Sequence, residues 1–277
     1  MKRLLCALAL SLVLAAPVRA AGPFQPLLGQ SLVPGSFKSG HPQSGFLRVG
    51  RFSENRSGPA ARPDGSGVAA NLYQLALQDA LAEGRAAWLG DALFLTDAGH
   101  GLWRLSSLDY LLGAAVQDEA FRLQVDREEA LPLDRGGSGF RVWDLRASLR
   151  MAQAPGKGGE AAAAKSGAYP LRAALTLGWY FKNAGYPSRP DGTGKAFLRY
   201  AAEAEAALSG GRLLFSAGAQ FLTDDHRRRY SPASAALSLG AGTSLQGLEL
   251  WATREERRVL DGPGYDSCWL FSLRAPF

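Results

Sequence analysis

Four arginines at regular positions are the residues of this sequence with the clearest chemical potential. They are Arg146, Arg150, Arg172 and Arg199. Arginine stays charged at every physiological pH, and its planar fork matches a carboxylate or a phosphate. Arginines stacked along one wall would therefore suit an acidic solute. Acidic residues on the same segments, Asp144, Glu203 and Glu205, would instead neutralise them in a cross-strand ion-pair network. Both interpretations are open from the sequence.

Histidines are the other side chains with catalytic potential, and the sequence has three of them. His41, His100 and His226 all fall in segments that we expect to be loops or tail. Each has a serine within six residues, but none shows a His-x-Ser spacing on a strand face. No cluster of His, Cys and Asp has the spacing of a metal site. We therefore assign no catalytic residue and no metal ligand, and we expect no cofactor.

The elements that must position the arginines have a period of two. In "LRAALTLGWYFK" (171–182), Leu175 and Leu177 share one face while Arg172 and Thr176 share the other. The segment "WDLRASLRM" (143–151) alternates in the same way, and its polar face carries Asp144, Arg146, Ser148 and Arg150. Alternation over about ten residues is typical of a β-strand that crosses a membrane, with its apolar face toward lipid.

Repeating this assignment along the chain predicts twelve strands, with ten and fourteen as the alternatives. The expected ranges are 45–52, 70–80, 85–96, 103–116, 119–127, 140–152, 170–182, 195–208, 212–223, 232–240, 246–256 and 265–277. Their connections alternate between long and short, except for a short one near His100 and a long one over 152–168. Long loops on one side and short turns on the other are the construction of membrane barrels. The predicted fold class is all-β, a single antiparallel transmembrane β-barrel over 45–277.

The N-terminal part of the chain has a different composition. Residues 1–20 combine Lys2 and Arg3 with an apolar run and a small-x-Ala ending, which is typical of a secretory signal peptide. Residues 21–44 are rich in Pro, Gly and Ser, and we expect a flexible tail or a short plug. Removal of residues 1–20 lowers the formal charge from +6 to +3. This balance gives no reason to expect a nucleic-acid partner.

The last thirteen residues, "YDSCWLFSLRAPF", alternate up to a final phenylalanine. Trp269, Phe271, Leu273 and Phe277 share the apolar face, although Ala275 and Pro276 are weaker matches to the same pattern. This segment resembles the C-terminal strand of Gram-negative outer-membrane β-barrel proteins. The resemblance implies that these four residues act as an assembly signal. It also implies an outer-membrane location and contacts with outer-membrane lipids, lipopolysaccharide, periplasmic chaperones and the barrel-assembly machinery.

The polar faces set the expectations for function. Acidic and basic residues are equally numerous on them, which argues against a selectivity ring of one sign. We expect a narrow porin-like channel or transporter for small solutes. The alternatives are an outer-membrane lipid-modifying hydrolase and a structural or adhesive barrel with an occluded lumen. The sequence leaves open whether the barrel is an enzyme, and it does not indicate an oligomeric state.

Overall fold

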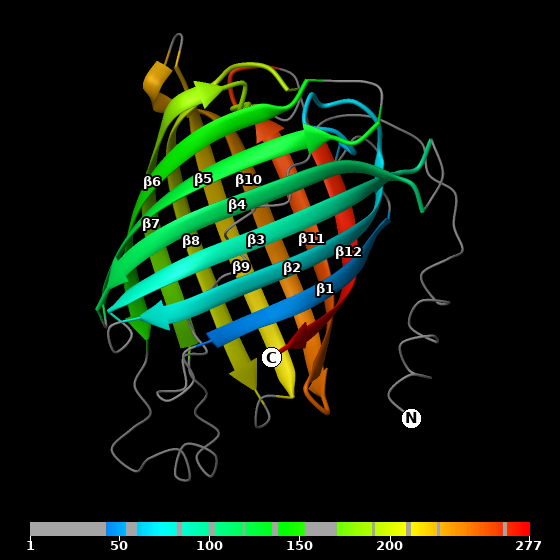
Figure 1. The fold of residues 1–277 in the computed structure, drawn as a ribbon, viewed down its shortest axis with the longest axis vertical. Helices are drawn as coiled ribbons and strands as arrows, with labels where there is room; N and C mark the ends of the chain where they lie inside the picture. Colours follow the sequence, from blue (N-terminus) through cyan, green and yellow to red (C-terminus); the bar gives the residue numbers. More distant parts are fainter. Residues whose placement is uncertain are drawn as a thin grey trace.

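The alternating segments pair edge to edge into a closed barrel of twelve antiparallel strands (Figure 1). Each strand pairs with its neighbours in the sequence, and β1 pairs with β12 to complete the circle. The computed structural model describes residues 43–53, 60–81, 85–99, 103–118, 120–134, 138–152, 171–189, 192–208, 212–225, 228–262 and 265–277. The predicted fold class is confirmed, and the predicted number of twelve strands is correct.

The strands are eleven to eighteen residues long. Their bounds are β1 Gln43–Ser53, β2 Ala69–Leu81, β3 Ala86–Asp97, β4 Leu105–Gln117, β5 Phe121–Pro132, β6 Phe140–Ala152, β7 Leu171–Ala184, β8 Ala196–Leu208, β9 Leu213–Asp224, β10 Arg228–Leu245, β11 Leu248–Val259 and β12 Tyr265–Pro276. The predicted signal peptide over 1–20 and tail over 21–44 lie outside the described residues, apart from the two residues that begin β1. No helix among the described residues is long and apolar enough to cross a membrane.

Several predicted boundaries were wrong by three to five residues: β5 and β10 end later than predicted, β10 begins four residues earlier, and β11 ends three residues later. The ends of β5 and β10 show the reason. Residues 128–132 were expected to begin a loop, yet they continue β5 because Glu128 and Glu129 pair with Val142 and Arg141 of β6. Residues 241–245 were expected to form a turn, yet they extend β10, and the turn to β11 is Gln246 and Gly247. In both places the strand continues because a neighbouring strand supplies hydrogen-bond partners. Polar composition had suggested a loop.

The barrel closes where β12 meets β1. Their register runs from Phe46 opposite Pro276 to Ser53 opposite Trp269. Beyond this ladder, Phe277 and Gly45 exchange two backbone hydrogen bonds of 2.9 and 3.0 Å. A Cβ atom on Gly45 would come within 2.8 Å of the Phe277 ring, so the ring occupies the space that the glycine leaves. The final residue of the sequence is therefore part of the seam.

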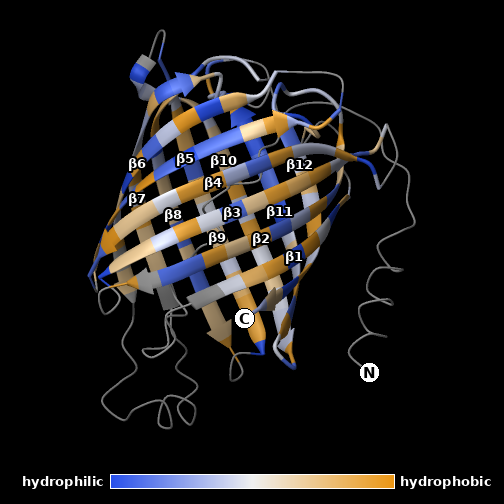
Figure 2. Ribbon diagram, viewed as in Figure 1, coloured by the Kyte–Doolittle hydropathy of each residue, from blue (hydrophilic) through white to orange (hydrophobic). Residues whose placement is uncertain are grey.

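Apolar side chains cover the outside of the barrel, as the alternation predicted. Leu175 and Leu177 point outward and are 49% and 51% exposed. Thr176, between them, points inward and shares a 2.9 Å hydrogen bond with Ser148 of β6. Hydrophobic and hydrophilic positions alternate along the strands in Figure 2. An apolar outer wall on a closed barrel is the arrangement that lipid requires. The molecule is therefore a transmembrane β-barrel of the outer-membrane type.

The two faces of β7 should respond differently to a charge. We expect Leu175→Arg to reduce the yield of assembled barrel much more than Thr176→Arg. An arginine on the lipid face near mid-membrane costs about 2–4 kcal/mol, and an arginine that points into the lumen costs far less. The folded fraction is measured as the heat-modifiable band on a gel. Equal losses for the two variants would show that the facing of β7 is wrong.

The seam gives a second test. Replacing Phe277 with Glu should lower the folded fraction, because it places a charge on the outer face where the ring packs against Gly45. Phe277→Tyr keeps the ring and serves as the control. Assembly is measured in isolated outer membranes, together with the amount of unfolded chain in the periplasm. Parent-like assembly of the Glu variant would contradict the role of this residue.

Candidate functional site

The interior of the barrel holds a compact network of opposite charges between β5 and β8. Arg146 Nε donates to Asp144 Oδ2 at 2.6 Å, and its Nη2 lies 3.1 Å from Asp126 Oδ2. Arg199 Nη1 lies 3.2 Å from the same oxygen of Asp144. The Arg199 guanidinium also donates to the hydroxyl of Tyr180 and lies 5.0 Å from the centre of its ring. Two arginines and two aspartates thus balance one another.

A glycine makes this network geometrically feasible. Asp144 and Arg199 lie on β6 and β8, so β7 runs between them, and Gly178 is the β7 residue opposite Arg146 and Arg199. A Cβ atom at Gly178 would come within 3.1 Å of Asp144 Oδ1 and 3.2 Å of Arg199 Cβ. The missing side chain lets an arginine reach across a whole strand. Any larger residue would have to displace one member of the pair.

The four arginines singled out by the sequence have different surroundings. The structure brings Arg146 and Arg199 together, and both are buried against protein carboxylates. Arg150 lies on β6 opposite Ala174, and Arg172 lies on β7 opposite Glu205. The side chains of these two are outside the described part of the structure. Solute binding by the four arginines stays a prediction.

Residues 60–68, the described part of the loop between β1 and β2, fold inward at the end of the barrel that carries the longer connections. Ala61 is fully buried in a cluster with apolar residues of β1, β2, β3 and β12. Arg62 anchors this loop, because its Nε donates to both oxygens of Asp134 at 2.8 and 2.9 Å and its Nη2 lies 3.1 Å from Asp97. The bond to Asp134 raises the pKa of Arg62. This segment fills the lumen beside β1–β3.

A second loop, between β7 and β8, fills the lumen on the other side. The Tyr186 ring stacks on Tyr180 with centroids 4.8 Å apart and meets Phe140 edge-on at 4.9 Å. Asn183 fixes the backbone of this loop: its amide donates to the carbonyl oxygens of Tyr186 and Ala196, and its side-chain oxygen accepts from the Tyr186 N–H. The loop is therefore held in place by both packing and hydrogen bonds.

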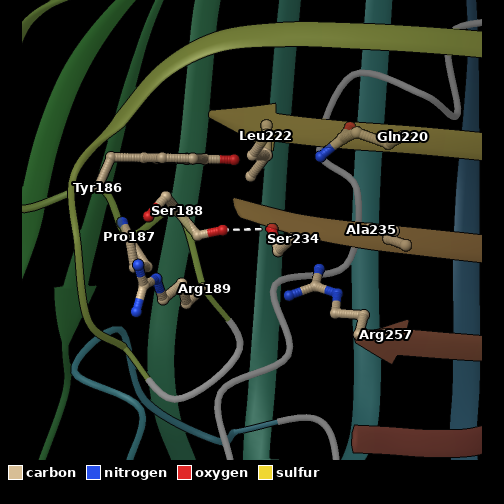
Figure 3. Close-up of a pocket in the computed structure, with 10 residues that line it drawn as sticks. Tyr186, Pro187, Ser188, Arg189, Gln220, Leu222, Ser234, Ala235 and Arg257 are labelled. Atoms are coloured by element: carbon tan, nitrogen blue, oxygen red, sulfur yellow. Dashed lines mark hydrogen bonds between the residues drawn. The ribbon is translucent and has the colours of Figure 1, made fainter. Parts of the chain in front are cut away.

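A small cavity separates this loop from the opposite wall (Figure 3). The residues that line it are Tyr186, Pro187, Ser188 and Arg189 of the loop, and Gln220, Leu222, Ser234, Ala235, Ala236 and Arg257 of β9–β11. Its volume of about 20 Å³ is enough for one water molecule. The Ser234 hydroxyl donates to the Ser188 carbonyl oxygen across it. Arg189 secures the loop through contacts of 3.4 Å with Asp224 and 2.8 Å with Asp261.

The two sides of the lumen are filled to different degrees. On β3 and β4 the inward residues Asp91, Leu93, Asp109 and Leu111 are all buried. On β8–β11 many inward residues remain partly exposed to solvent. These include Glu203 of β8, Ser216 and Gly218 of β9, Ser238, Gly240, Gly242 and Ser244 of β10, and Glu255 and Arg257 of β11. Most of these positions on β9 and β10 carry glycine or serine. The interior is therefore less completely filled beside β8–β11 than beside β3 and β4.

Other predicted residues have mixed outcomes. Trp269 and Phe271 stack on the outer face with centroids 6.2 Å apart, and Phe271 and Phe277 are exposed. Their role as an assembly signal stays a prediction. His41, His100 and His226 lie outside the described residues. Sequence reasoning missed the inward loops, because nothing in a loop's composition reports which way it folds. No group of three or more His, Cys, Asp or Glu residues in the described ranges is arranged to hold a metal ion.

The chain is similar to several proteins of known structure. LpxR from Salmonella typhimurium is 10% identical over 84% of this chain and 99% of its own, with a TM-score of 0.47. An outer membrane channel from Pseudomonas putida F1 is 11% identical over 85% and 95%, with a TM-score of 0.44. The translocator domain of the autotransporter NalP from Neisseria meningitidis is 10% identical over 89% and 92%, with a TM-score of 0.43. No family model matches, and no curated protein is significantly similar. These likenesses carry no argument about activity.

The charge network can be tested by neutralising its shared carboxylate. Asp144→Asn should lower the free energy of unfolding by about 3–5 kcal/mol, because it leaves two buried arginines short of negative charge. Glu249→Gln is a matched control, since the pair of Glu249 and Arg274 is longer, at 3.4 Å, and partly exposed. That change should cost about 0–1 kcal/mol. Urea unfolding in detergent, followed by tryptophan fluorescence, measures both. Similar losses for the two variants would contradict the central role of Asp144.

Proposed function

We propose that the protein is a narrow outer-membrane channel for small polar solutes, with its path along the β8–β11 wall. The supporting observation is the uneven filling of the lumen. Inward residues on β3 and β4 are buried, whereas β8–β11 have both buried inward residues, such as Gln220 and Thr253, and partly exposed ones, such as Gly218 and Ser238. In a barrel of this size, side chains decide how much of the interior stays open. Small residues on β9 and β10 leave that space.

The lining of the path suits polar solutes of either charge. Glu203, Gly218, Ser238 and Glu255 lie directly opposite one another on β8, β9, β10 and β11. Two carboxylates thus flank two small residues, and Arg257 follows Glu255 on the inward face of β11. Mixed charge argues against strong selection for one sign. Hydroxyl groups and charged side chains supply hydrogen bonds to replace part of a solute's hydration shell.

The cavity between the Tyr186–Arg189 loop and β9–β11 is the constriction of this path. Because Ser188 and Ser234 join the loop to the wall here, we expect solutes larger than water to pass only when the loop moves away. Arg189 and Ser188 hold the loop against the wall through Asp224, Asp261 and Ser234. The proposed channel is therefore narrow at rest, and its opening depends on these contacts.

One observation favours a second candidate, a structural barrel with an occluded lumen. Two buried apolar clusters occupy the loop end of the interior, one around Ala61 and one around Tyr186. If the loops never leave, the barrel conducts nothing and serves as a membrane scaffold. The hydrolase alternative stays a prediction, because the histidines on which it depends lie outside the described residues.

Cysteine accessibility distinguishes these candidates. In a background without the two native cysteines, Ser238→Cys should react with a charged, water-soluble thiol reagent. The reaction should then reduce single-channel conductance in a planar bilayer, because Ser238 lines the proposed path. Leu239→Cys is the matched control: the next residue of β10 is 65% exposed but faces lipid, which a charged reagent cannot enter.

The outcomes separate the proposals cleanly. Conductance in the parent that falls on modification of Ser238→Cys, but not of Leu239→Cys, supports the channel and its position. A parent that gives no conductance steps over the full voltage range overturns the channel and supports the occluded barrel. Conductance that is insensitive to modification at Ser238 means that the path does not follow this wall.

A further inference from the structure

A cluster of polar side chains lies on the outer, lipid-facing wall of the barrel. Glu129 of β5 is at its centre: one oxygen accepts from the Tyr110 hydroxyl at 2.8 Å and from Arg127 Nη2 at 2.9 Å. Arg141 of β6 donates from Nη2 to the other oxygen at 2.9 Å, and from Nε to the first oxygen at 3.1 Å. Three adjacent strands therefore contribute to one site, which carries two positive charges and one negative charge.

The outward direction of this cluster follows from the alternation along each strand. Val125 and Leu131 flank Arg127 and Glu129 on the same face of β5, while Asp126 and Glu128 point inward and are buried. Arg127 lies directly opposite Trp143, and Glu129 lies opposite Arg141. The cluster thus interrupts the otherwise apolar outer face of β4–β6. Charged groups on such a wall are costly unless a partner receives them.

The cluster lies at the level of the membrane interface. Glu129 is three residues before the end of β5, and Arg141 is the second residue of β6, so both lie near the loop end of the barrel. The neighbouring Trp143 stacks with Phe181 at 6.2 Å, and Phe181 contacts Trp179 at 5.4 Å. Outward-facing aromatic residues of this kind mark the interface in membrane barrels. Because the longer loops of such barrels are extracellular, we expect the headgroups of the outer leaflet at the height of the two guanidinium groups.

Glu129 holds both arginines in place, yet their guanidinium groups remain accessible from outside the barrel. Their side chains are 40% and 55% exposed for Arg127 and Arg141, whereas that of Glu129 is 10% exposed. One carboxylate orients both planar groups and leaves an excess of one positive charge. Guanidinium groups bind phosphate through paired, charge-assisted hydrogen bonds. A positioned pair with free donors at headgroup height suits a phosphate ester.

We propose that Arg127 and Arg141, oriented by Glu129, bind a phosphate group of lipid A, the phosphorylated glycolipid of the outer leaflet. The acyl chains then lie along the apolar wall of β4–β6, beside outward residues such as Leu112 and Val125. Tyr110 of β4 holds the Glu129 carboxylate in place through its hydroxyl. This site is on the opposite face of the wall from the lumen, so it is independent of the proposed channel.

Lipid titration of the intact barrel in detergent tests the site. The probes are diphosphorylated lipid A, chemically dephosphorylated lipid A and phosphatidylglycerol, with native mass spectrometry as the measurement. We expect the parent to bind diphosphorylated lipid A, and the double variant Arg127→Gln/Arg141→Gln to bind it about tenfold more weakly or worse. Arg254→Gln is the matched control, because Arg254 also faces outward and pairs with one carboxylate, Glu256, at 3.6 Å, far from the Glu129 cluster.

Three results would overturn the assignment. They are parent-like binding by the double variant, equal binding of dephosphorylated lipid A to the parent, and equal binding of phosphatidylglycerol. If the double variant fails to fold, Arg141→Gln alone replaces it, since Arg141 is the more exposed of the two. This single variant should still weaken binding by several-fold, and unchanged binding would equally overturn the proposal. Conductance is not used here, so failure of the channel leaves this test intact.

Discussion

The requirement that every backbone N–H and C=O group be hydrogen-bonded in lipid determines the rest of this structure. A sheet in a membrane cannot leave an edge, because unpaired backbone groups in hydrocarbon cost several kcal/mol each. The chain meets this requirement when β12 pairs with β1, and the pairing continues to the last residue through Phe277 and Gly45. Once the circle is closed, each strand has one face toward lipid and one toward the interior. The alternation of the sequence follows from that geometry.

Closure also creates an interior that side chains must fill. Polar residues can line it only if they find partners, and on β5–β8 they do so by exchanging charges: Asp144 serves both Arg146 and Arg199. The absence of a side chain at Gly178 allows that exchange across an intervening strand. On the neighbouring strands β9 and β10, glycine and serine occupy many inward positions. The same barrel thus combines inward charges that pair with one another and inward side chains that occupy little space.

The loops add a second level of control over that interior. Arg62 and Asn183 are loop or strand-end residues, and each holds an inward-folded segment in place with several hydrogen bonds. Because these bonds are few and lie at the barrel end, the segments are easier to displace than the strands. On the outer wall, too, one side chain holds several others: the Glu129 carboxylate accepts hydrogen bonds from three polar partners, Tyr110, Arg127 and Arg141. In each case one well-placed polar group fixes its surroundings.

The sequence by itself determined the number of strands and the direction of their faces. Alternation is a local property: once Leu175 points to lipid, Thr176 points inward whatever the neighbouring strands do. Strand ends were less certain, because residues such as Glu128 are polar and continue a strand only when another strand is available to pair with them.

Tertiary structure alone decided which charges meet. Asp144 reaches Arg199 because the register of β6, β7 and β8 brings Gly178 between them, and Glu129 joins Arg141 because the longer β5 lies opposite the start of β6. Those partners are 12 to 55 residues apart in the chain, and their meeting depends on register and closure, which no local pattern encodes. Tertiary structure also decided that the segments around Ala61 and Tyr186 fold inward, because that folding depends on the space that the closed barrel leaves.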